Sequence, residues 1–262
     1  MLKKICLAAA ALAMCVISSC STTEDSTYKR QSQLRVGITA NMPPMIYKFN
    51  DKVLGIEADF AEELAKALEK ELKYVELDWT EQIAALENGD IDIIMSGMTV
   101  TEPRRRHVNF TMPYMLSGLG ALIRKADYNR LQVRTVLLNN RGGVGVEKGT
   151  TGDELVTTIM PVSKKYVASN IYDLRDLLID KKVDAVVHDF PTLWFAADVK
   201  KEDNLTVAPY SLMSEHIAWA VGKSNYQLMK QVDDVLLQWQ KNGKTESILK
   251  KWLPEHSRFS TK

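Results

Sequence analysis

Beyond residue 33 the chain alternates between short apolar runs and longer segments whose apolar residues recur at helical spacing. Leu34–Thr39 and Tyr74–Leu77 predict strands. The segments 58–68 and 80–88 predict helices that pack on a sheet. Ile91–Met95 is apolar at nearly every position, which is typical of a strand covered on both faces. This order of elements predicts an α/β protein in which helices flank central sheets.

A second alternating series begins after residue 123 and has a similar plan, without a tight sequence repeat. Its expected strands and helices are, in order, 143–146, 151–159, 166–168, 172–180, 183–187 and 191–198. Ile217–Val221 is then expected as one strand, followed by a long helix over Asn225–Gln240. Ligands of such sheets lie at the carboxyl ends of the strands, so the loops after Met95, Val146 and Val187 are expected to carry the function.

Length and composition limit the classes of function that the chain can have. Its 262 residues suggest about two domains, and the net charge of +1 gives no general attraction to nucleic acid. The three cysteines, Cys6, Cys15 and Cys20, all lie within the first 20 residues. With only four histidines and no later cysteine, a cysteine-rich zinc site, a disulfide scaffold and a catalytic thiol are excluded.

The N-terminal residues have the pattern of a targeting signal. Two lysines precede the apolar run Ile5–Ile17, which is too short to cross a hydrocarbon core that needs about 20 residues. The run ends in Ile-Ser-Ser-Cys, which resembles a bacterial lipobox and predicts cleavage before Cys20 and lipidation of its thiol. We therefore expect a lipoprotein signal peptide over 1–19 and a flexible, Ser/Thr-rich tether over 20–32. An ordinary secretory signal or a buried N-terminal helix is the alternative.

Several motifs follow one another in an order that is specific to one family. They occupy residues 79–92, 96–104, 108–114, 144–151, 183–189, 242–243 and 251–253. Together they closely resemble the polar amino-acid (family 3) extracellular solute-binding proteins, which feed bacterial ABC importers. The resemblance runs from about Leu34 to Pro254 and so covers nearly the whole mature chain.

This resemblance implies a two-lobe periplasmic-binding-protein fold of type II, in which each lobe has a central sheet flanked by helices and two strands form the hinge. Lobe 1 would hold residues 33–116 plus 216–256, and lobe 2 would hold 117–215. Residues 257–262 would form a C-terminal tail. The ligand is expected in the cleft between the lobes.

The residues at the strand ends suit a zwitterionic amino acid. Arg104 offers a guanidinium fork for a carboxylate, and its placement follows if Thr101 caps a short helix. Thr99 adds a hydroxyl, and the small Gly97 lets a ligand approach the backbone. Asp189, just past an apolar strand, would accept the ligand's ammonium group, or would only cap the helix that follows.

The family resemblance assigns roles to individual positions. It implies that Arg104, Thr99, Thr151 and Asp189 hold the amino-acid backbone, and Thr151 follows Thr150 at a helix start whose free N–H groups favour a carboxylate. The remaining positions expected to line the pocket near the ligand side chain are Trp79, His188 and Met42. The sequence departs from the family where Met42 replaces an aromatic residue and Ala40 replaces an acidic one, which argues against a basic ligand.

We therefore expect a monomeric, lipid-anchored binding protein of the cell envelope, facing the periplasm or the cell surface. It would capture a small amino acid-like solute and present it to an ABC permease, without nucleic acid, metal or catalysis. A cofactor is not expected, because the glycines at 143, 145 and 149 miss the dinucleotide-binding spacing. The alternatives are a periplasmic cyclohexadienyl dehydratase-like enzyme and a ligand sensor or orphan binder that serves no transporter.

Overall fold

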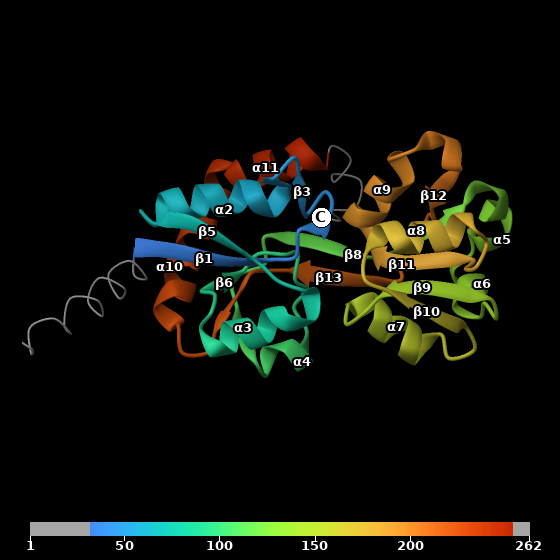
Figure 1. Cartoon of the computed structure of the whole chain (residues 1–262), viewed down its shortest axis with the longest axis horizontal. Coiled ribbons are helices and arrows are strands. Elements are labelled where there is room, and N and C mark those ends of the chain that lie inside the picture. Colours follow the sequence, from blue (N-terminus) through green and yellow to red (C-terminus); the bar gives the residue numbers. More distant parts are fainter. Residues whose placement is uncertain (1–31, 254–262) are drawn as a thin grey trace, which may run out of the picture.

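The computed structural model describes residues 32–253, and within them the chain forms two α/β lobes that lie side by side (Figure 1). The expected signal peptide, Cys20 and the C-terminal tail lie outside the described residues, as do all but the last residue of the expected tether. No helix in the described part of the chain is long and apolar enough to cross a membrane.

The first lobe is built on a sheet with the strand order β5-β1-β6-β14-β7. Strand β1 pairs in parallel with both β5 and β6, while β14 returns antiparallel to β6 and β7. In Figure 1, α2 and α11 cover one face of this sheet, and α3 and α4 lie on the other. The strands are β1 (Gln33–Ile38), β5 (Glu71–Glu76), β6 (Ile93–Ile94), β7 (Val108–Phe110) and β14 (Ala220–Gly222). The helices are α2 (Ile56–Ala67), η1 (Trp79–Glu81), α3 (Gln82–Asn88), α4 (Glu102–Arg105), α10 (Tyr226–Asn242) and α11 (Lys244–Trp252). A small antiparallel sheet of β2 (Asn41–Met42), β3 (Ile46–Phe49) and β4 (Lys52–Leu54) precedes α2.

The second lobe has a sheet with the order β10-β9-β11-β8-β12, and β13 also pairs with β8. Helices α8 and α9 lie on one side of this sheet and α7 on the other (Figure 1). Its strands are β8 (Met115–Arg124), β9 (Gly143–Glu147), β10 (Lys164–Ala168), β11 (Ala185–Asp189), β12 (Leu205–Val207) and β13 (Met213–Ile217). Its helices are η2 (Lys125–Asp127), α5 (Tyr128–Leu131), α6 (Arg134–Leu138), α7 (Thr151–Ile159), α8 (Ile171–Ile179), α9 (Phe190–Asp198) and η3 (Lys201–Asp203).

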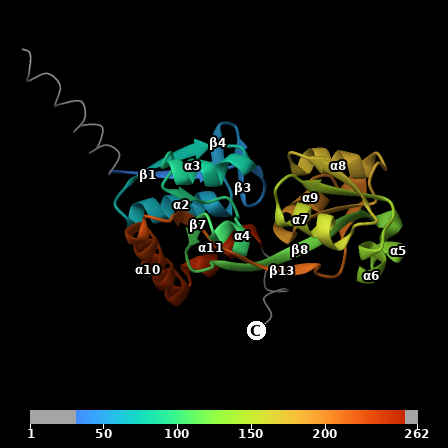
Figure 2. The same ribbon diagram turned by 90° about the horizontal axis from the view of Figure 1, so that it is seen from below.

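Strands β8 and β13 join the two lobes, and Figure 2 shows them running from one lobe into the other. They pair antiparallel, with Met115 opposite Ile217 and Leu119 opposite Met213. One strand carries the chain out and the other carries it back, so the second lobe is an insertion between β7 and β14.

The expected single strand over Ile217–Val221 is wrong, because the chain changes partner within it. Strand β13 pairs with β8 and ends at Ile217, and β14 pairs with β6 and β7 from Ala220. Between them the N–H of Ala218 donates to the Met98 carbonyl at 3.1 Å. The residues that were expected as one element therefore form the passage from the second lobe into the sheet of the first.

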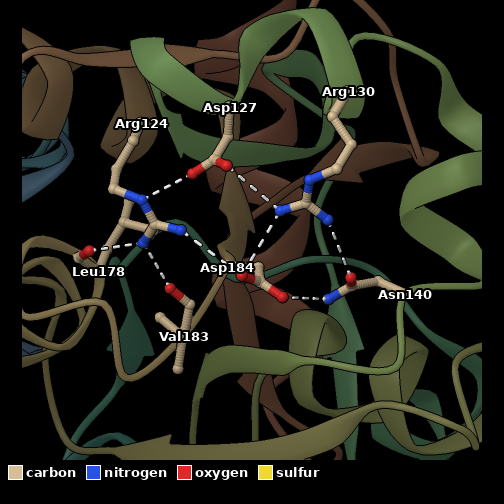
Figure 3. Close-up of polar contacts among 7 residues, drawn as sticks. All are labelled: Arg124, Asp127, Arg130, Asn140, Leu178, Val183 and Asp184. Atoms are coloured by element: carbon tan, nitrogen blue, oxygen red, sulfur yellow. Dashed lines mark hydrogen bonds and ion pairs between the residues drawn. The ribbon is translucent and has the colours of Figure 1, made fainter.

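The far end of the second lobe is held by a polar network of seven residues (Figure 3). They are Arg124, Asp127, Arg130, Asn140, Leu178, Val183 and Asp184. Arg124 donates to Asp127 at 2.7 Å and to two backbone carbonyl oxygens at 2.6 and 2.7 Å. Asp184 accepts from Asn140 at 3.1 Å and lies 3.5 Å from both arginines. We call this the distal network, and each of its two carboxylates has a cationic partner inside the lobe.

Candidate ligand-binding cleft

Arg104 is positioned by the start of a short helix at the edge of the first lobe. Thr101 is the N-cap of α4, and its hydroxyl accepts the N–H of Arg104 at 3.3 Å, as the sequence predicts. The guanidinium donates to the Thr99 carbonyl at 2.9 Å and lies over the Trp79 ring, 5.1 Å from its centroid. A second guanidinium nitrogen is 3.4 Å from the carbonyl oxygen of Gly149 in the second lobe. Arg104 therefore lies at the boundary between the lobes.

The loop that carries Gly97 is fixed by a buried carboxylate from α2. Glu57 accepts the N–H of Gly97 at 2.5 Å, the hydroxyl of Tyr114 at 2.8 Å and the indole N–H of Trp219 at 2.7 Å. Burial raises the pKa of Glu57 to about 7, although these three donors act to lower it. Gly97 has φ +67°, a conformation that other residues adopt at a cost, and an added Cβ would meet Met45 at 3.2 Å. Glu57, in the first turn of α2, thus supports the loop after β6.

The second lobe contributes the turn between β9 and α7. The hydroxyl of Thr150 accepts the N–H of Asp153 at 3.3 Å and donates to the Glu147 carbonyl at 2.8 Å, so it is engaged in capping the helix. Thr151 follows as the first residue of α7 and is buried. The indole N–H of Trp79 donates to the carbonyl of Gly149 at 3.0 Å, which brings the turn against the first lobe.

Three ionisable side chains meet where β9 and β11 end. Nε2 of His188 is 3.1 Å from Glu147, and its Nδ1 is 3.3 Å from the Asp189 carboxylate. Burial lowers the pKa of His188, but hydrogen bonds and charges from both carboxylates outweigh burial and raise it to about 10. The N–H of Asp189 also points at Nδ1, at 2.8 Å, which favours an unprotonated ring. The hydrogen bonds and charges that raise the pKa of His188 to about 10 outweigh this contact, so we assign His188 as the imidazolium.

Asp189 is the N-cap residue of α9, yet its carboxylate makes no capping hydrogen bond. Burial raises the pKa of Asp189, but His188, a hydrogen bond from Glu215 and the positive charge of Arg104 outweigh it and hold the pKa below its usual value. Oδ1 of Asp189 is buried without a hydrogen-bond donor among residues 32–253. The carboxylate is therefore ionised, and one of its oxygens remains available to a ligand.

A second carboxyl group, which sequence reasoning missed, lies beside Asp189. Glu215 on β13 is 97% buried (3% exposed), and neither of its oxygens has a donor in the described part of the chain. Burial raises the pKa of Glu215 to about 9, and the charge of Asp189 adds to the effect, while Thr151 and Arg104 oppose it. Glu215 shares the inward phase of β13 with the buried Ile217, but no strand was expected before Ile217, so this phase could not be predicted.

The cavity between Met42 and Asp189 is narrow and mainly apolar. Met42 is buried and lines a small cavity of about 10 Å³, together with Gly97, Asp189 and other residues. The further lining residues are Met45, Ser96, Met115, Ser117, Pro191, Thr192 and Ile217. The cavity is smaller than a side chain, so the lobes are closed tightly on each other in this structure.

The structure brings the expected residues to one boundary between the lobes. Gly97, Thr99, Arg104, Trp79 and Met42 come from the first lobe. Thr150, Thr151, His188 and Asp189 come from the second. Sequence reasoning assigned no role to Glu147 or Glu215, because their position depends on strand pairing that no local pattern records.

The two sheets, the pair of connecting strands and the residues gathered between the lobes define a periplasmic-binding-protein fold. Residues 34–255 match the model of the bacterial extracellular solute-binding proteins, family 3. The chain belongs to this family, as the order of its motifs predicts.

Known relatives have the same fold over most of their length. The L-cystine-binding protein TcyJ of Escherichia coli strain K12 is 28% identical over 228 residues, which cover 86% of this chain and 84% of TcyJ. The crystal structure of the ancestral amino acid-binding protein AncCDT-1, a precursor of cyclohexadienyl dehydratase, has a TM-score of 0.78 and 29% identity, and the match covers 88% of this chain and 98% of that one. An ancestral arginine-binding protein bound to arginine has a TM-score of 0.79 and 28% identity, with 84% and 98% covered.

Proposed function

We propose that this protein is a lipid-anchored binding protein of the cell envelope that captures a small amino acid-like solute between its lobes and presents it to an ABC importer. The observation that carries the proposal is that Arg104 from one lobe and Asp189 from the other lie close enough for each charge to act on the pKa of the other group. An α-amino acid carries a carboxylate and an ammonium group on one carbon. A fixed cation facing a fixed anion matches that pair of charges.

Each of these groups has a defined part in the proposal. The guanidinium of Arg104 pairs with the ligand carboxylate, which also accepts hydrogen bonds from Thr99 and from Thr151 at the start of α7. Oδ1 of Asp189 accepts from the ligand ammonium. Gly97 and the turn around Thr150 allow the backbone to approach the ligand closely, because neither places a long side chain there.

Both lobes contact the ligand in this proposal, so binding stabilises the closed state over the open one. Lobe 1 would comprise residues 33–116 plus 216–256, of which 254–256 lie outside the described residues, and lobe 2 would comprise 117–215, with β8 and β13 as the hinge. Across the boundary the Trp79–Gly149 hydrogen bond adds to closure. An importer would then recognise the closed form.

Residues at the other end of the cleft would select the ligand side chain. Met42 gives a soft apolar wall, Trp79 gives an aromatic face, and His188 supplies a charged group behind Asp189. The relatives are named for amino acids as different as cystine and arginine. Ala40 replaces an acidic residue that is common in the family, so the proposed ligand does not have a basic side chain.

The attachment to the membrane rests on the sequence Ile-Ser-Ser-Cys that ends at Cys20. Acyl chains on this residue would anchor the protein by burying methylene groups at about 0.8 kcal/mol each. Labelling expressing cells with radioactive palmitate should mark the wild-type chain and not the Cys20→Ala variant. Equal labelling of both chains would contradict lipidation at this residue.

The binding proposal is tested by a thermal-shift screen of L-cystine, L-glutamine, L-histidine and L-arginine, followed by calorimetry of any that stabilise the protein. A ligand that binds only the native state raises its melting temperature. Asp189→Asn should weaken binding by about 1.5–3 kcal/mol, because it removes a charged acceptor for the ammonium group. An unchanged affinity in this variant would show that Asp189 does not contact the ligand.

One observation favours a second candidate, a dehydratase-like enzyme. Glu215 is a buried carboxyl group whose pKa is raised to about 9, so it holds a proton that it could donate to a leaving hydroxyl group. A precursor of cyclohexadienyl dehydratase is also among the structural relatives. Incubation of the purified protein with prephenate or arogenate decides between the two, since turnover lost in Glu215→Gln would establish the enzyme.

A further inference from the structure

Three buried acceptor oxygens of the cleft have no donor among residues 32–253. They are Oδ1 of Asp189 and both carboxylate oxygens of Glu215. Buried polar groups in native proteins are nearly always hydrogen-bonded, and an unpaired one costs free energy. In the described part of the chain, these oxygens interact only with the Thr151 hydroxyl and with the proton of Glu215, which lies between the two carboxyl groups. Most of their capacity to accept hydrogen bonds is therefore unused by the fold.

The strand register explains why these two side chains converge. Both β11 and β13 pair antiparallel with β8, where Asp189 is opposite Leu119 and Glu215 is opposite Ser117. Residues directly opposite each other share a face of the sheet, and so do residues two apart on one strand. Asp189 and Glu215 thus project from the same face, on either side of β8.

We propose that Glu215 is a ligand-binding residue, which together with Asp189 forms a two-carboxylate subsite for a primary ammonium group. This proposal rests on the proposed function, because it describes the ammonium end of the same ligand. It adds a residue from the hinge strand β13 to a site otherwise formed by the two lobes.

A primary ammonium group matches the subsite in the number of its hydrogen-bond donors and in the sign of its charge. It has three N–H donors and no acceptor, and the three oxygens are all acceptors once Glu215 has lost its proton. A trimethylated nitrogen has no donor, and a hydroxyl group has only one, so either would leave buried oxygens unpaired. The subsite should therefore discriminate against ligands that lack the primary ammonium group.

Glu57 shows what a structural carboxylate looks like in this protein. It is fully buried, as Glu215 nearly is, but it accepts three hydrogen bonds from Gly97, Tyr114 and Trp219. Glu215 has the same chemistry and almost the same burial, without any of these donors. We therefore assign a structural role to Glu57 and a ligand-binding role to Glu215.

Because of the charges around Glu215, we expect this residue to release a proton when the ligand binds. The groups that face it are Asp189 on β11, the Thr151 hydroxyl on α7 and Arg104 on α4, with Ser117 opposite on β8. Behind Asp189, Nε2 of His188 lies 3.1 Å from the Glu147 carboxyl group. In the ligand-free cleft, burial and Asp189 keep a proton on Glu215 at neutral pH. An ammonium group between the two carboxyls replaces that proton, which leaves for the buffer.

The test is isothermal titration calorimetry at neutral pH in buffers of different ionisation enthalpy. The probe is whichever of L-cystine, L-glutamine, L-histidine and L-arginine binds the wild type, with the matching N-acetyl derivative as a second probe. The wild type should release close to one proton per ligand, since Glu215 ionises on binding. Glu215→Gln should release none and should bind about 10-fold to 100-fold more weakly, the loss expected for hydrogen bonds to a charged group.

Two comparisons separate a binding role from a structural one. Glutamine has the shape of a protonated glutamate, so Glu215→Gln should keep or raise the melting temperature of the ligand-free protein while affinity falls. Glu154→Gln is the matched control, because Glu154 is exposed but also near enough to act on Arg104. This variant should bind within about twofold of the wild type and release the same proton, because the exposed charge is screened by solvent.

The outcomes are distinguishable. If Glu215→Gln binds as tightly as the wild type and releases as many protons, the subsite is wrong and the binding proposal stands. If the N-acetyl derivative binds as well as the free amino acid, the subsite is wrong as well. If the wild type binds none of the four amino acids, the proposed function fails and the subsite fails with it.

Discussion

The second lobe has charged clusters at both ends, and they differ in how their charges are paired. In the distal network, Asp127 and Asp184 both lie against arginines of the same lobe (Figure 3). At the cleft, Asp189 leaves one carboxylate oxygen and Glu215 leaves two without a donor in the described chain. The same residue types thus complete their hydrogen bonds inside the fold at one end and not at the other. The two clusters therefore differ in whether their carboxyl groups have hydrogen-bond partners within the lobe, and not in the charges that they contain. We assign the paired groups a structural role and the unpaired ones a role in ligand binding.

The largest effect is expected for Arg104→Ala. Removing the guanidinium should cost on the order of 2–5 kcal/mol of binding free energy for an amino acid, because its carboxylate loses a bidentate partner. The melting temperature of the ligand-free protein should change little, since Arg104 donates only to two carbonyl oxygens. Calorimetry and thermal unfolding of the same preparation measure both quantities. An affinity equal to that of the wild type would remove Arg104 from the site.

For Arg124→Ala, at the other end of the lobe, we expect the opposite result: a loss of stability without a loss of affinity. It leaves Asp127 without its 2.7 Å partner and exposes two carbonyl oxygens that Arg124 holds. We expect a loss of about 3 kcal/mol in the free energy of unfolding, as for other broken buried pairs. Amino-acid affinity should stay the same. A variant with intact stability and weakened binding would reverse the assignment of the two clusters.

The pH dependence of stability tests the protonation of the two buried glutamates, Glu57 and Glu215. Burial raises the pKa of Glu57 to about 7 and that of Glu215 to about 9, both above the value of an unfolded glutamate. The folded state then binds more protons than the unfolded state, so the free energy of unfolding should fall as the pH rises toward about 9. Thermal unfolding of the ligand-free protein measures this slope.

Glu215→Gln should make that slope shallower up to about pH 9, because one group with a raised pKa is lost. The remaining slope should come from Glu57 up to about pH 7 and from His188, whose pKa is raised to about 10, at higher pH. A slope that is identical in the variant and the wild type would show that Glu215 does not titrate in this range.

The smallest effect is expected for Trp79→Phe. The substitution removes the 3.0 Å hydrogen bond to Gly149 and keeps most of the ring, so affinity should fall by about 0.5–1.5 kcal/mol through a less stable closed state. Trp252→Phe is the matched control, because it removes a 2.8 Å bond to Asp59 within the first lobe. The control should change stability and leave affinity unaltered. Small-angle scattering should show a larger open fraction only for Trp79→Phe.

Local sequence patterns predicted the elements where one residue fixes a boundary. Helix α7 begins at Thr151 and ends at Ile159, as predicted, because Thr150 caps its first turn. Arg104 could be placed for the same reason, since Thr101 starts α4. The motif that carries Asp189 ends an apolar strand, so its position at the strand end followed from the sequence.

What the sequence did not predict depends on which strands become neighbours. The pair of His188 and Glu147 forms because β9 and β11 pair in parallel, with Val146 opposite Val187. Glu215 reaches Asp189 only through their shared neighbour β8. Such contacts join residues far apart in the chain, and no spacing of residues along the sequence encodes them.

The most direct test of the account compares an amino acid with the 2-hydroxy acid of the same side chain by calorimetry. The two ligands differ only in that the amino acid has an ammonium group where the hydroxy acid has a hydroxyl group. We propose that the oxygens of Asp189 and Glu215 accept hydrogen bonds from this ammonium group. We expect the hydroxy acid to bind at least about 100-fold more weakly, because a hydroxyl group leaves buried carboxylate oxygens unpaired. Equal affinities for the two ligands would contradict it.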